Sequence, residues 1–148
     1  DSHRRQRQMC IRDRLNIFTS FGYFDESSDN FKVVQAMADN IKKGGKVVLD
    51  FMNAKKVIKD LVKSESKTVD NIQFTIKRSY ENGFLIKDIY FTDKHQFHFQ
   101  EKVQALTLSD FMDLFEKSGL KIINLWGDYS LNDFNAIHSP RLIILAQK

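Results

Sequence analysis

The chain has 148 residues, of which 42% are hydrophobic and one is proline, and its formal net charge is +4. This length and apolar content suffice for one packed globular domain and exclude a disordered linker. No window approaches the roughly 18 consecutive apolar residues of a membrane-spanning helix, so we expect no membrane partner. The single cysteine, Cys10, excludes a disulfide framework and favours a reducing, cytoplasmic compartment.

The first fourteen residues differ in composition from the rest of the chain. They hold five of the seven arginines, whereas the remainder has sixteen lysines and only Arg78 and Arg141. We therefore expect residues 1–14 to be a non-native leader and residues 15–148 to be the domain, with a genuine basic arm as the alternative. Without this leader the net charge is only +1. The positive charge of the chain is therefore no argument for a nucleic-acid partner.

The start of the domain predicts one β–α–β crossover unit. Residues 15–21 have the pattern of a buried strand, and a polar, acidic loop follows that can cap a helix. Apolar residues at helical spacing over 31–41 predict that helix, which we expect to end at Lys42-Lys43, before Gly44-Gly45. The nearly continuous apolar run 47–52 predicts a strand covered on both faces, as in a parallel sheet.

Between residues 54 and 104 the pattern changes to short alternating segments. A short helix around 55–63 is expected first. The strand-like runs that follow are 72–76, 85–91 and 97–99, with an extension over 101–103 left open. Asn82-Gly83 predicts a tight hairpin turn, because both residues tolerate a positive φ, and 92–94 predicts the next turn. Together these signals predict an inserted antiparallel β meander.

The end of the chain predicts a helix and two strands. Apolar residues from Leu108 to Phe115 share one helical face, and Thr107 or Ser109 can cap the helix. Residues 120–126 and 141–146 have the pattern of strands. We expect these two strands to pair antiparallel.

Several segments together carry a resemblance to a known family. They are Phe18–Phe24, Asp29-Asn30, Lys43–Gly45, Val47–Asn53, Thr107–Phe111, Lys117–Leu120, Gly127–Tyr129 and Ser139–Ile144. With these segments in this order, the chain resembles the second half of a class I S-adenosylmethionine-dependent methyltransferase. The resemblance covers residues 15–148 and implies an α/β fold. That fold is a partial Rossmann-like methyltransferase sheet, with parallel strands, a terminal antiparallel pair and a substrate-side meander inserted at about 54–104.

The first half of such a domain has no counterpart in this sequence. None of the six glycines forms a G-x-G turn between a strand and a helix, which the family uses to bind its cofactor. We therefore expect residues 15–148 to be the C-terminal half of a methyltransferase domain, and the chain alone to be an inactive fragment. Many relatives carry an arginine near the position of Gln104. If that arginine touches their substrate, the same substrate cannot be inferred for this chain.

The predicted site lies where the first strand ends, because open parallel sheets bind ligands at the carboxyl ends of their strands. By resemblance, Phe18 and Ser20 border the methionine part of S-adenosyl-L-methionine, and Phe21 and Tyr23 wall its junction with a small-molecule acceptor. Methyl transfer is an in-line displacement at a sulfonium carbon, so positioning in a dry aromatic pocket matters most. Packing in the core is the alternative for Phe18 and Phe21.

Later elements supply further candidates for the acceptor side. Asn53 can hydrogen-bond an acceptor group or serve a loop, and Tyr129 belongs to a cluster at a strand end. Arg78 and Tyr90 can line a pocket from the meander or simply face solvent. Asp50 lies within an apolar strand and must have a partner, because an unpaired buried carboxylate is costly. No residue is assigned as catalytic.

Other chemistries find less support in the sequence. His95 and His98 would point to opposite faces of a strand and no cysteine accompanies them, so we predict no metal site. Ser20 lacks the G-x-S-x-G turn of a nucleophilic serine. The second function class is a noncatalytic α/β module that binds protein or RNA through the lysine-rich stretch 42–63 and the meander. The sequence leaves the methyl acceptor and the oligomeric state open.

Overall fold

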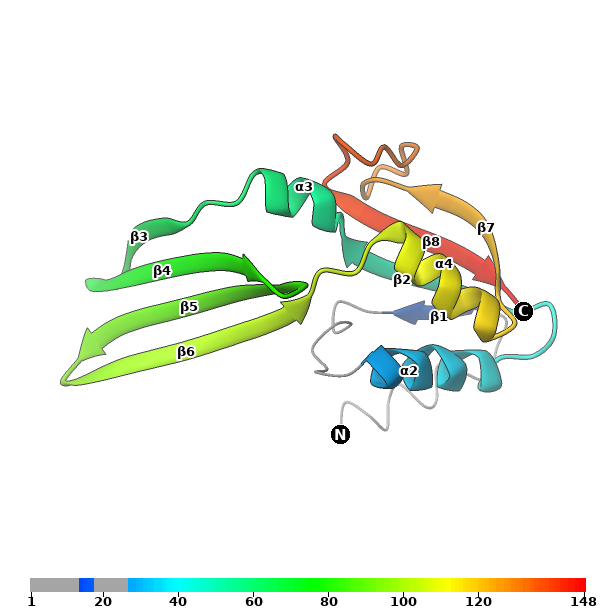
Figure 1. Cartoon of the computed structure of the whole chain (residues 1–148), viewed down its shortest axis with the longest axis horizontal. Helices are drawn as coiled ribbons and strands as arrows, with labels where there is room; N and C mark the ends of the chain where they lie inside the picture. Colours follow the sequence, from blue (N-terminus) through cyan, green and yellow to red (C-terminus); the bar gives the residue numbers. More distant parts are fainter. Residues whose placement is uncertain (1–13, 18–26) are drawn as a thin grey trace.

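The structure is a computed structural model that describes residues 14–17 and 27–148. It contains two four-stranded sheets, which we call the body sheet and the meander (Figure 1). The body sheet has the strand order β1 (Arg14–Ile17), β2 (Lys46–Met52), β8 (Arg141–Gln147) and β7 (Lys121–Trp126). The meander has the order β3 (Ser64–Val69), β4 (Ile72–Glu81), β5 (Phe84–Asp93) and β6 (His95–Gln104).

The body sheet is mixed. β1 pairs parallel with β2, and α2 (Ser27–Asp39) lies between them in the chain, as the predicted crossover requires. β8 pairs antiparallel with both β2 and β7, which confirms the predicted terminal pair. The last strand therefore lies between two earlier ones. Among the described strands only β1 and β2 are parallel, so an extended parallel sheet is not observed there.

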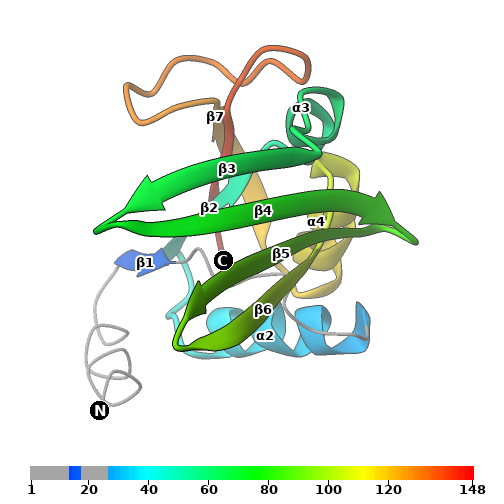
Figure 2. The ribbon, with the colours of Figure 1, turned by 90° about the vertical axis from the view of Figure 1, so that its left-hand side faces the viewer.

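One face of the body sheet carries the hydrophobic core. The helices α2 and α4 (Leu108–Lys117) lie on the same side of this sheet (Figure 2). The buried residues of the core come from both helices and from β2 and β8: Val34, Ala38, Phe111, Phe115, Val47, Leu49, Phe51, Leu142, Ile144 and Ala146. On β2 these residues alternate with half-buried Val48, Asp50 and Met52. The prediction of a strand covered on both faces is therefore only partly met.

The ends of the two core helices differ in how well the sequence predicted them. α2 ends at Asp39, so the predicted end at Lys42-Lys43 is wrong; a turn follows, in which the Gly45 N–H donates to the Lys42 carbonyl. α4 begins with a capping box, in which the Thr107 side chain accepts from the Asp110 N–H and the Asp110 carboxylate accepts from the Thr107 N–H. Thr107, and not Ser109, is therefore the cap.

The meander confirms most of its sequence signals. Asn82 and Gly83 both have positive φ values, 51° and 83°, between β4 and β5, and Lys94 (φ 59°) forms the turn before β6. The short helix α3 (Ala54–Lys59) ends earlier than the predicted 55–63. β3 was not predicted, because its polar sequence SESKTV lacks apolar alternation. β3 is held instead by backbone pairing with β4, which follows it in the chain after a turn at Asp70-Asn71.

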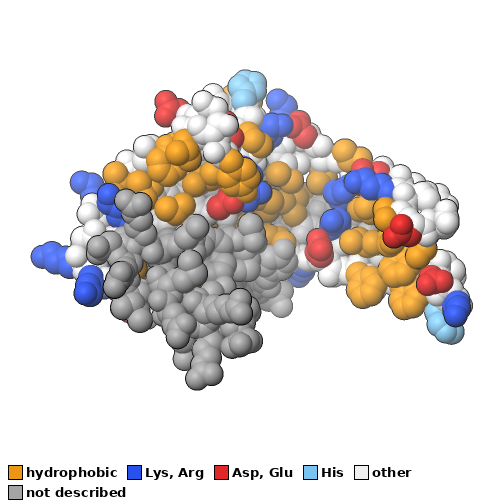
Figure 3. Space-filling view, turned by 180° about the vertical axis from the view of Figure 1, so that it is seen from behind, with side chains coloured by type: hydrophobic (Ala, Val, Ile, Leu, Met, Phe, Trp, Pro, Cys, Tyr) orange, Lys and Arg blue, Asp and Glu red, His pale blue; other side chains and the backbone are white. Residues whose placement is uncertain are grey.

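The register gives the meander an apolar face and a polar face. The apolar face is formed mainly by Phe74, Ile76, Ile89, Phe91, Phe97 and Phe99, which lie opposite one another on β4, β5 and β6. The polar face carries Gln73, Thr75, Tyr90, Gln96, His98 and Gln100. Seen from behind, the meander shows a gathering of hydrophobic side chains (Figure 3). No helix among the described residues is long and apolar enough to cross a membrane.

Candidate functional site

The candidate site lies at the edge of the body sheet where β1 and β2 both end. Parallel strands present their carboxyl ends at one edge, and Figure 1 shows the meander extending from that edge. The predicted residues Phe18, Ser20, Phe21 and Tyr23 follow β1 in the chain, but they lie outside the described residues. The described part of the site is therefore built from β2, α3, the start of α4 and the loop 127–140.

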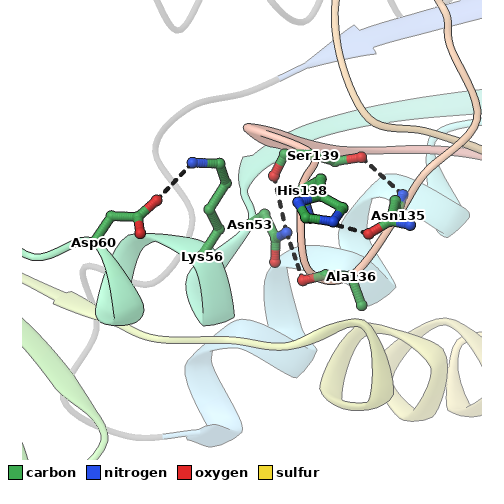
Figure 4. A network of polar contacts seen from close by, with 7 residues as sticks. All are labelled: Asn53, Lys56, Asp60, Asn135, Ala136, His138 and Ser139. Carbon is green, nitrogen blue, oxygen red and sulfur yellow. Dashed lines mark hydrogen bonds and ion pairs between the residues drawn. The ribbon is translucent and has the colours of Figure 1, made fainter.

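Asn53 directly follows β2 and is buried, with an exposed fraction of 3%. Its Nδ2 group donates to the carbonyl oxygens of Ala136 and Ser139, at 3.0 and 2.9 Å (Figure 4). Both N–H donors of the amide are therefore used by the loop, and only Oδ1 remains to meet an acceptor molecule. The geometry favours the structural reading of Asn53, which attaches the loop to the end of β2.

The loop 127–140 holds itself in shape through its own polar groups. The Ser139 hydroxyl accepts from the Asn135 N–H at 2.7 Å, and Asn135 Oδ1 accepts from the backbone N–H groups of Ile137 and His138. Gly127 packs so closely that an added Cβ would lie 2.0 Å from Ser139 Oγ. Asn132 donates to the Asp128 carboxylate, and this hydrogen bond lowers the pKa of Asp128. These hydrogen bonds and contacts within the loop give it a defined conformation.

A small cavity of about 240 Å³ opens between this loop and the starts of α3 and α4. Its lining is mostly apolar and includes Ala54, Leu106, Met112, Phe134 and Leu142. No local signal in the sequence marks this group, because its members come from four separate segments. A cavity of this size and character accommodates a small apolar group.

A second polar cluster joins β2, β8 and the loop. Asp50 Oδ1 accepts from Arg141 Nε and Nη2 at 3.0 and 2.9 Å, and Asp50 Oδ2 accepts from the Tyr129 hydroxyl at 2.7 Å. The expectation that Asp50 has a partner is confirmed. The hydrogen bond to the Asp50 carboxylate raises the pKa of Tyr129. The Tyr129 hydroxyl therefore stays protonated at neutral pH and does not act as a base there.

The structure does not bring Arg78 and Tyr90 together. Arg78 lies on the apolar face, where Nη2 pairs with Glu65 at 2.8 Å and lowers the pKa of that carboxyl group. Tyr90 lies on the polar face and stacks on His98, with ring centroids 4.4 Å apart. Because the two side chains are on opposite faces of one sheet, they cannot both line a pocket on either face.

His98 forms a hydrogen bond with Asp88 on the polar face. Its Nε2 lies 2.7 Å from Asp88 Oδ1, and this hydrogen bond is the main cause that lowers the pKa of Asp88. Within the described ranges, no group of three His, Cys, Asp or Glu residues is placed to hold a metal ion.

One buried contact links the meander to the helical layer. Asn30 in α2 is 1% exposed, and its Nδ2 donates to the side-chain oxygen of Gln104, the last residue of β6. The sequence marked Asn30 only as part of the resemblance and Gln104 only as a departure from it. Their separation of 74 positions explains why no local pattern could pair them.

The fold defined by these elements matches solved structures. No protein-family model matches the chain, and no curated protein matches it in sequence. A S-adenosylmethionine-dependent methyltransferase from Clostridium acetobutylicum is similar over 91% of this chain and 57% of its own, with a TM-score of 0.77 and 18% identity. The CcbJ methyltransferase from Streptomyces caelestis is similar over 91% of this chain and 56% of its own, with a TM-score of 0.74 and 11% identity.

A sugar N-methyltransferase from Streptoalloteichus is also similar, over 93% of this chain and 57% of its own, with a TM-score of 0.64 and 12% identity. At such identities the likeness establishes the fold. The protein therefore has the α/β fold of part of a S-adenosylmethionine-dependent methyltransferase, and it spans little more than half the length of the solved structures that it matches.

Proposed function

We propose that residues 15–148 form the carboxyl-terminal half of a class I methyltransferase domain that transfers a methyl group from S-adenosylmethionine to a small molecule. The observation that carries this proposal is the match over 91% of the chain at a TM-score of 0.77. In this proposal the Rossmann-like parallel sheet is completed by strands that lie next to β1, which has β2 as its neighbour among the described strands.

The proposed cofactor is S-adenosylmethionine. Two solved neighbours have it bound: an amino pentose methyltransferase, and a glycopeptide N-methyltransferase that was also crystallised with S-adenosylhomocysteine. The cofactor supplies an electrophilic methyl group on a sulfonium. In this chain Phe18, Ser20 and Phe21 would border it, at the carboxyl end of β1. An aromatic wall there attracts the cationic donor and keeps water out.

The proposed acceptor is a small molecule bound between the carboxyl edge of the body sheet and the meander. Sugar and glycopeptide methyltransferases among the solved neighbours support this class of acceptor. Tyr23 would face the acceptor from the turn after β1. From the meander, only one of Arg78 and Tyr90 can face the acceptor, because the two side chains lie on opposite faces. Asn53 and Tyr129 then support the site by holding the loop 127–140.

In this mechanism the described residues position the reactants. Both oxygens of the Asp50 carboxylate are occupied by Arg141 and Tyr129, and the raised pKa of Tyr129 keeps its hydroxyl protonated at neutral pH. Methyl transfer by in-line displacement depends chiefly on holding donor and acceptor in line and near each other. We therefore expect the edge of the body sheet and the meander to contribute to methyl transfer by orienting the donor and the acceptor.

The noncatalytic alternative finds less support in the geometry. The lysines of the stretch 42–63 do not form one patch, because Lys42, Lys43 and Lys46 precede or begin β2 while the others follow its end. A strand of seven residues separates the two groups by about 23 Å.

The cytoplasmic location expected from the cysteine content stays a prediction.

The test of the proposed function is cofactor binding by the protein encoded by the native reading frame, including the codons upstream of Leu15. Titration calorimetry with S-adenosylmethionine and with S-adenosylhomocysteine should show binding, which Phe18→Ala should weaken. The matched control is Phe91→Ala, which removes an aromatic ring near the β5–β6 turn, at the end of the meander far from the body sheet (Figure 1). A folded native protein that binds neither compound would overturn the assignment.

A further inference from the structure

The cavity between the loop 127–140 and the starts of α3 and α4 is mostly apolar but has one buried polar side chain in its lining. The volume of the cavity is about 240 Å³, and the buried polar side chain is that of Asn53, which is 3% exposed. An apolar cavity of about 150 Å³ is large enough to bind benzene. The cavity therefore has room for one aromatic ring or an alkyl group of similar size.

The side-chain oxygen of Asn53 accepts no hydrogen bond from the described residues. Its amide nitrogen donates to the carbonyl groups of Ala136 and Ser139, at 3.0 and 2.9 Å, and Figure 4 shows both bonds. Within the described part of the chain, Asn30 Oδ1 is the one side-chain oxygen or nitrogen that is both unpaired and closed off from solvent. Asn53 Oδ1 is unpaired but accessible, and Asn53 lines the cavity. The loop thus fixes the orientation of an acceptor atom at this cavity.

The other polar side chains of the lining are either occupied or lie at the opening. The Thr107 hydroxyl donates to the Asp110 carboxylate at 3.0 Å and accepts from the Asp110 N–H. Lys55 and Ser109 are exposed, so they lie where the cavity opens to solvent. Among the side chains of the lining, Asn53 Oδ1 is therefore the polar atom that an occupant of the interior has to satisfy.

The charge of the lining disfavours a cationic occupant. Lys55 is the charged residue of the lining, and no Asp or Glu from the described residues belongs to it. An ammonium group that donated to Asn53 Oδ1 would lose its water without gaining a counter-ion. A neutral hydroxyl avoids this cost and brings one donor. An amide N–H would also bring a carbonyl oxygen, which needs a donor of its own.

We propose that this cavity binds an apolar aryl or alkyl group that carries one neutral hydroxyl, and that this hydroxyl donates to Asn53 Oδ1. An occupant without a donor would displace water from this oxygen and leave it unpaired, which is unfavourable. The cavity lies beside the end of β2, at the carboxyl edge of the body sheet. The assignment of the bound group to the methyl acceptor rests on the proposed function. The acceptor is then an aromatic or aliphatic alcohol, or a larger molecule with such a group.

Binding of small probes to the full chain, without cofactor, tests the cavity by itself. Phenol and toluene have nearly the same shape and differ in the hydroxyl group that can donate. Chemical-shift titrations followed at the methyl groups of Ala54 and Ala136, which line the cavity, measure the two affinities. Phenol should bind in the millimolar range, as expected for so small a ligand. It should bind about tenfold more tightly than toluene, because toluene leaves Asn53 Oδ1 unpaired.

A second pair of probes tests the charge of the occupant. Benzyl alcohol and benzylamine have the same carbon frame, and benzylamine is a cation at neutral pH. Benzyl alcohol should bind more tightly, because the lining supplies no carboxylate to the ammonium group.

Two variants test the location of the binding site. Met112 lines the cavity and is 53% exposed, so Met112→Trp fills the cavity from a position that tolerates a larger side chain. It should weaken phenol binding at least tenfold. The matched control is Ile123→Trp, at an apolar residue of β7 that is 46% exposed and lies outside the lining, and it should leave the affinity unchanged.

A third variant tests the acceptor atom. Asn53→Leu replaces the amide with an apolar side chain of similar size and should bind toluene more tightly than phenol. This variant also loses the hydrogen bonds to the loop, so circular dichroism has to show that it is folded. Met112→Trp leaves Asn53 in place and keeps the test decisive if Asn53→Leu does not fold.

Three results would overturn the proposal: phenol that binds no more tightly than toluene, benzylamine that binds as tightly as benzyl alcohol, and unchanged phenol affinity in Met112→Trp. These titrations contain no S-adenosylmethionine, so their failure is distinct from failure of the proposed function. In the protein from the native reading frame, Met112→Trp should leave the affinity for S-adenosylmethionine unchanged. Loss of cofactor binding in this folded variant would refute the assignment of the cavity to the acceptor.

Discussion

Arg141 at the start of β8 holds the carboxylate of Asp50 in β2 with two of its nitrogens, Nε at 3.0 Å and Nη2 at 2.9 Å. Both side chains are about one quarter exposed or less, at 26% and 21%. The pair explains how a carboxylate is tolerated in the strand KVVLDFM, in which every other residue after Lys46 is apolar. It also joins the end of the chain to β2, beside the loop 127–140.

Removing one member of this pair should destabilise the domain. We expect Arg141→Met to lower the free energy of unfolding by about 1–3 kcal/mol, because it leaves a partly buried carboxylate without its charged partner. Urea denaturation measures the change. The matched control is Lys56→Met, which breaks the exposed pair with Asp60 and should cost much less, because solvent screens an exposed ion pair. Equal costs for the two variants would contradict the prediction.

The hydroxyl of Tyr129 should titrate above the ordinary tyrosine pKa. Its hydrogen bond to the Asp50 carboxylate stabilises the protonated form and raises the pKa. The bond therefore stabilises the fold below the ordinary pKa near 10, and this contribution is lost as the pH rises through the raised value. Subtracting the spectroscopic titration curve of Tyr129→Phe from that of the wild type isolates the titration of this residue. In Asp50→Asn the midpoint should move back toward the ordinary value, and an unchanged midpoint would contradict the assignment.

Asn53 should control the order of the loop 127–140. Asn53→Ala removes two hydrogen bonds to the carbonyl groups of Ala136 and Ser139, and we expect a loss of about 2 kcal/mol in stability. Amide hydrogen exchange should accelerate in the loop more than in the meander. Asn124→Ala is the control, because among the described residues the Asn124 side chain bonds to the neighbouring backbone N–H of Leu125 and to no distant segment. Uniform acceleration across the domain would point to a general loss of stability instead.

The capping box should stabilise α4 through one specific residue. Thr107→Ala removes the side chain that accepts from the Asp110 N–H and should cost about 1 kcal/mol. Ser109→Ala, two residues further on, should leave stability nearly unchanged. Thermal or urea unfolding of the two variants decides between the two caps that the sequence allowed. A larger loss in Ser109→Ala would show that the cap has been assigned to the wrong residue.

Local signals in the sequence determined much of the architecture. The pair Asn82-Gly83 predicted the β4–β5 turn because few residues tolerate consecutive positive φ values. The helical spacing over 108–115 predicted α4, and the apolar run 47–52 predicted β2. The alternation between 72 and 103 predicted three strands of the meander. These features depend on periodicity and turn chemistry within a few residues, so the sequence alone suffices.

Only the tertiary structure decided which distant residues meet. The insertion of β8 between β2 and β7, the polar strand β3 and the pairing of Asn30 with Gln104 leave no local pattern. The same is true of the partners of Asp50: the sequence required a partner, and the register of β2 with β8 supplied Arg141. The faces of Arg78 and Tyr90 were likewise fixed by strand register, because a shift of one residue reverses every side chain.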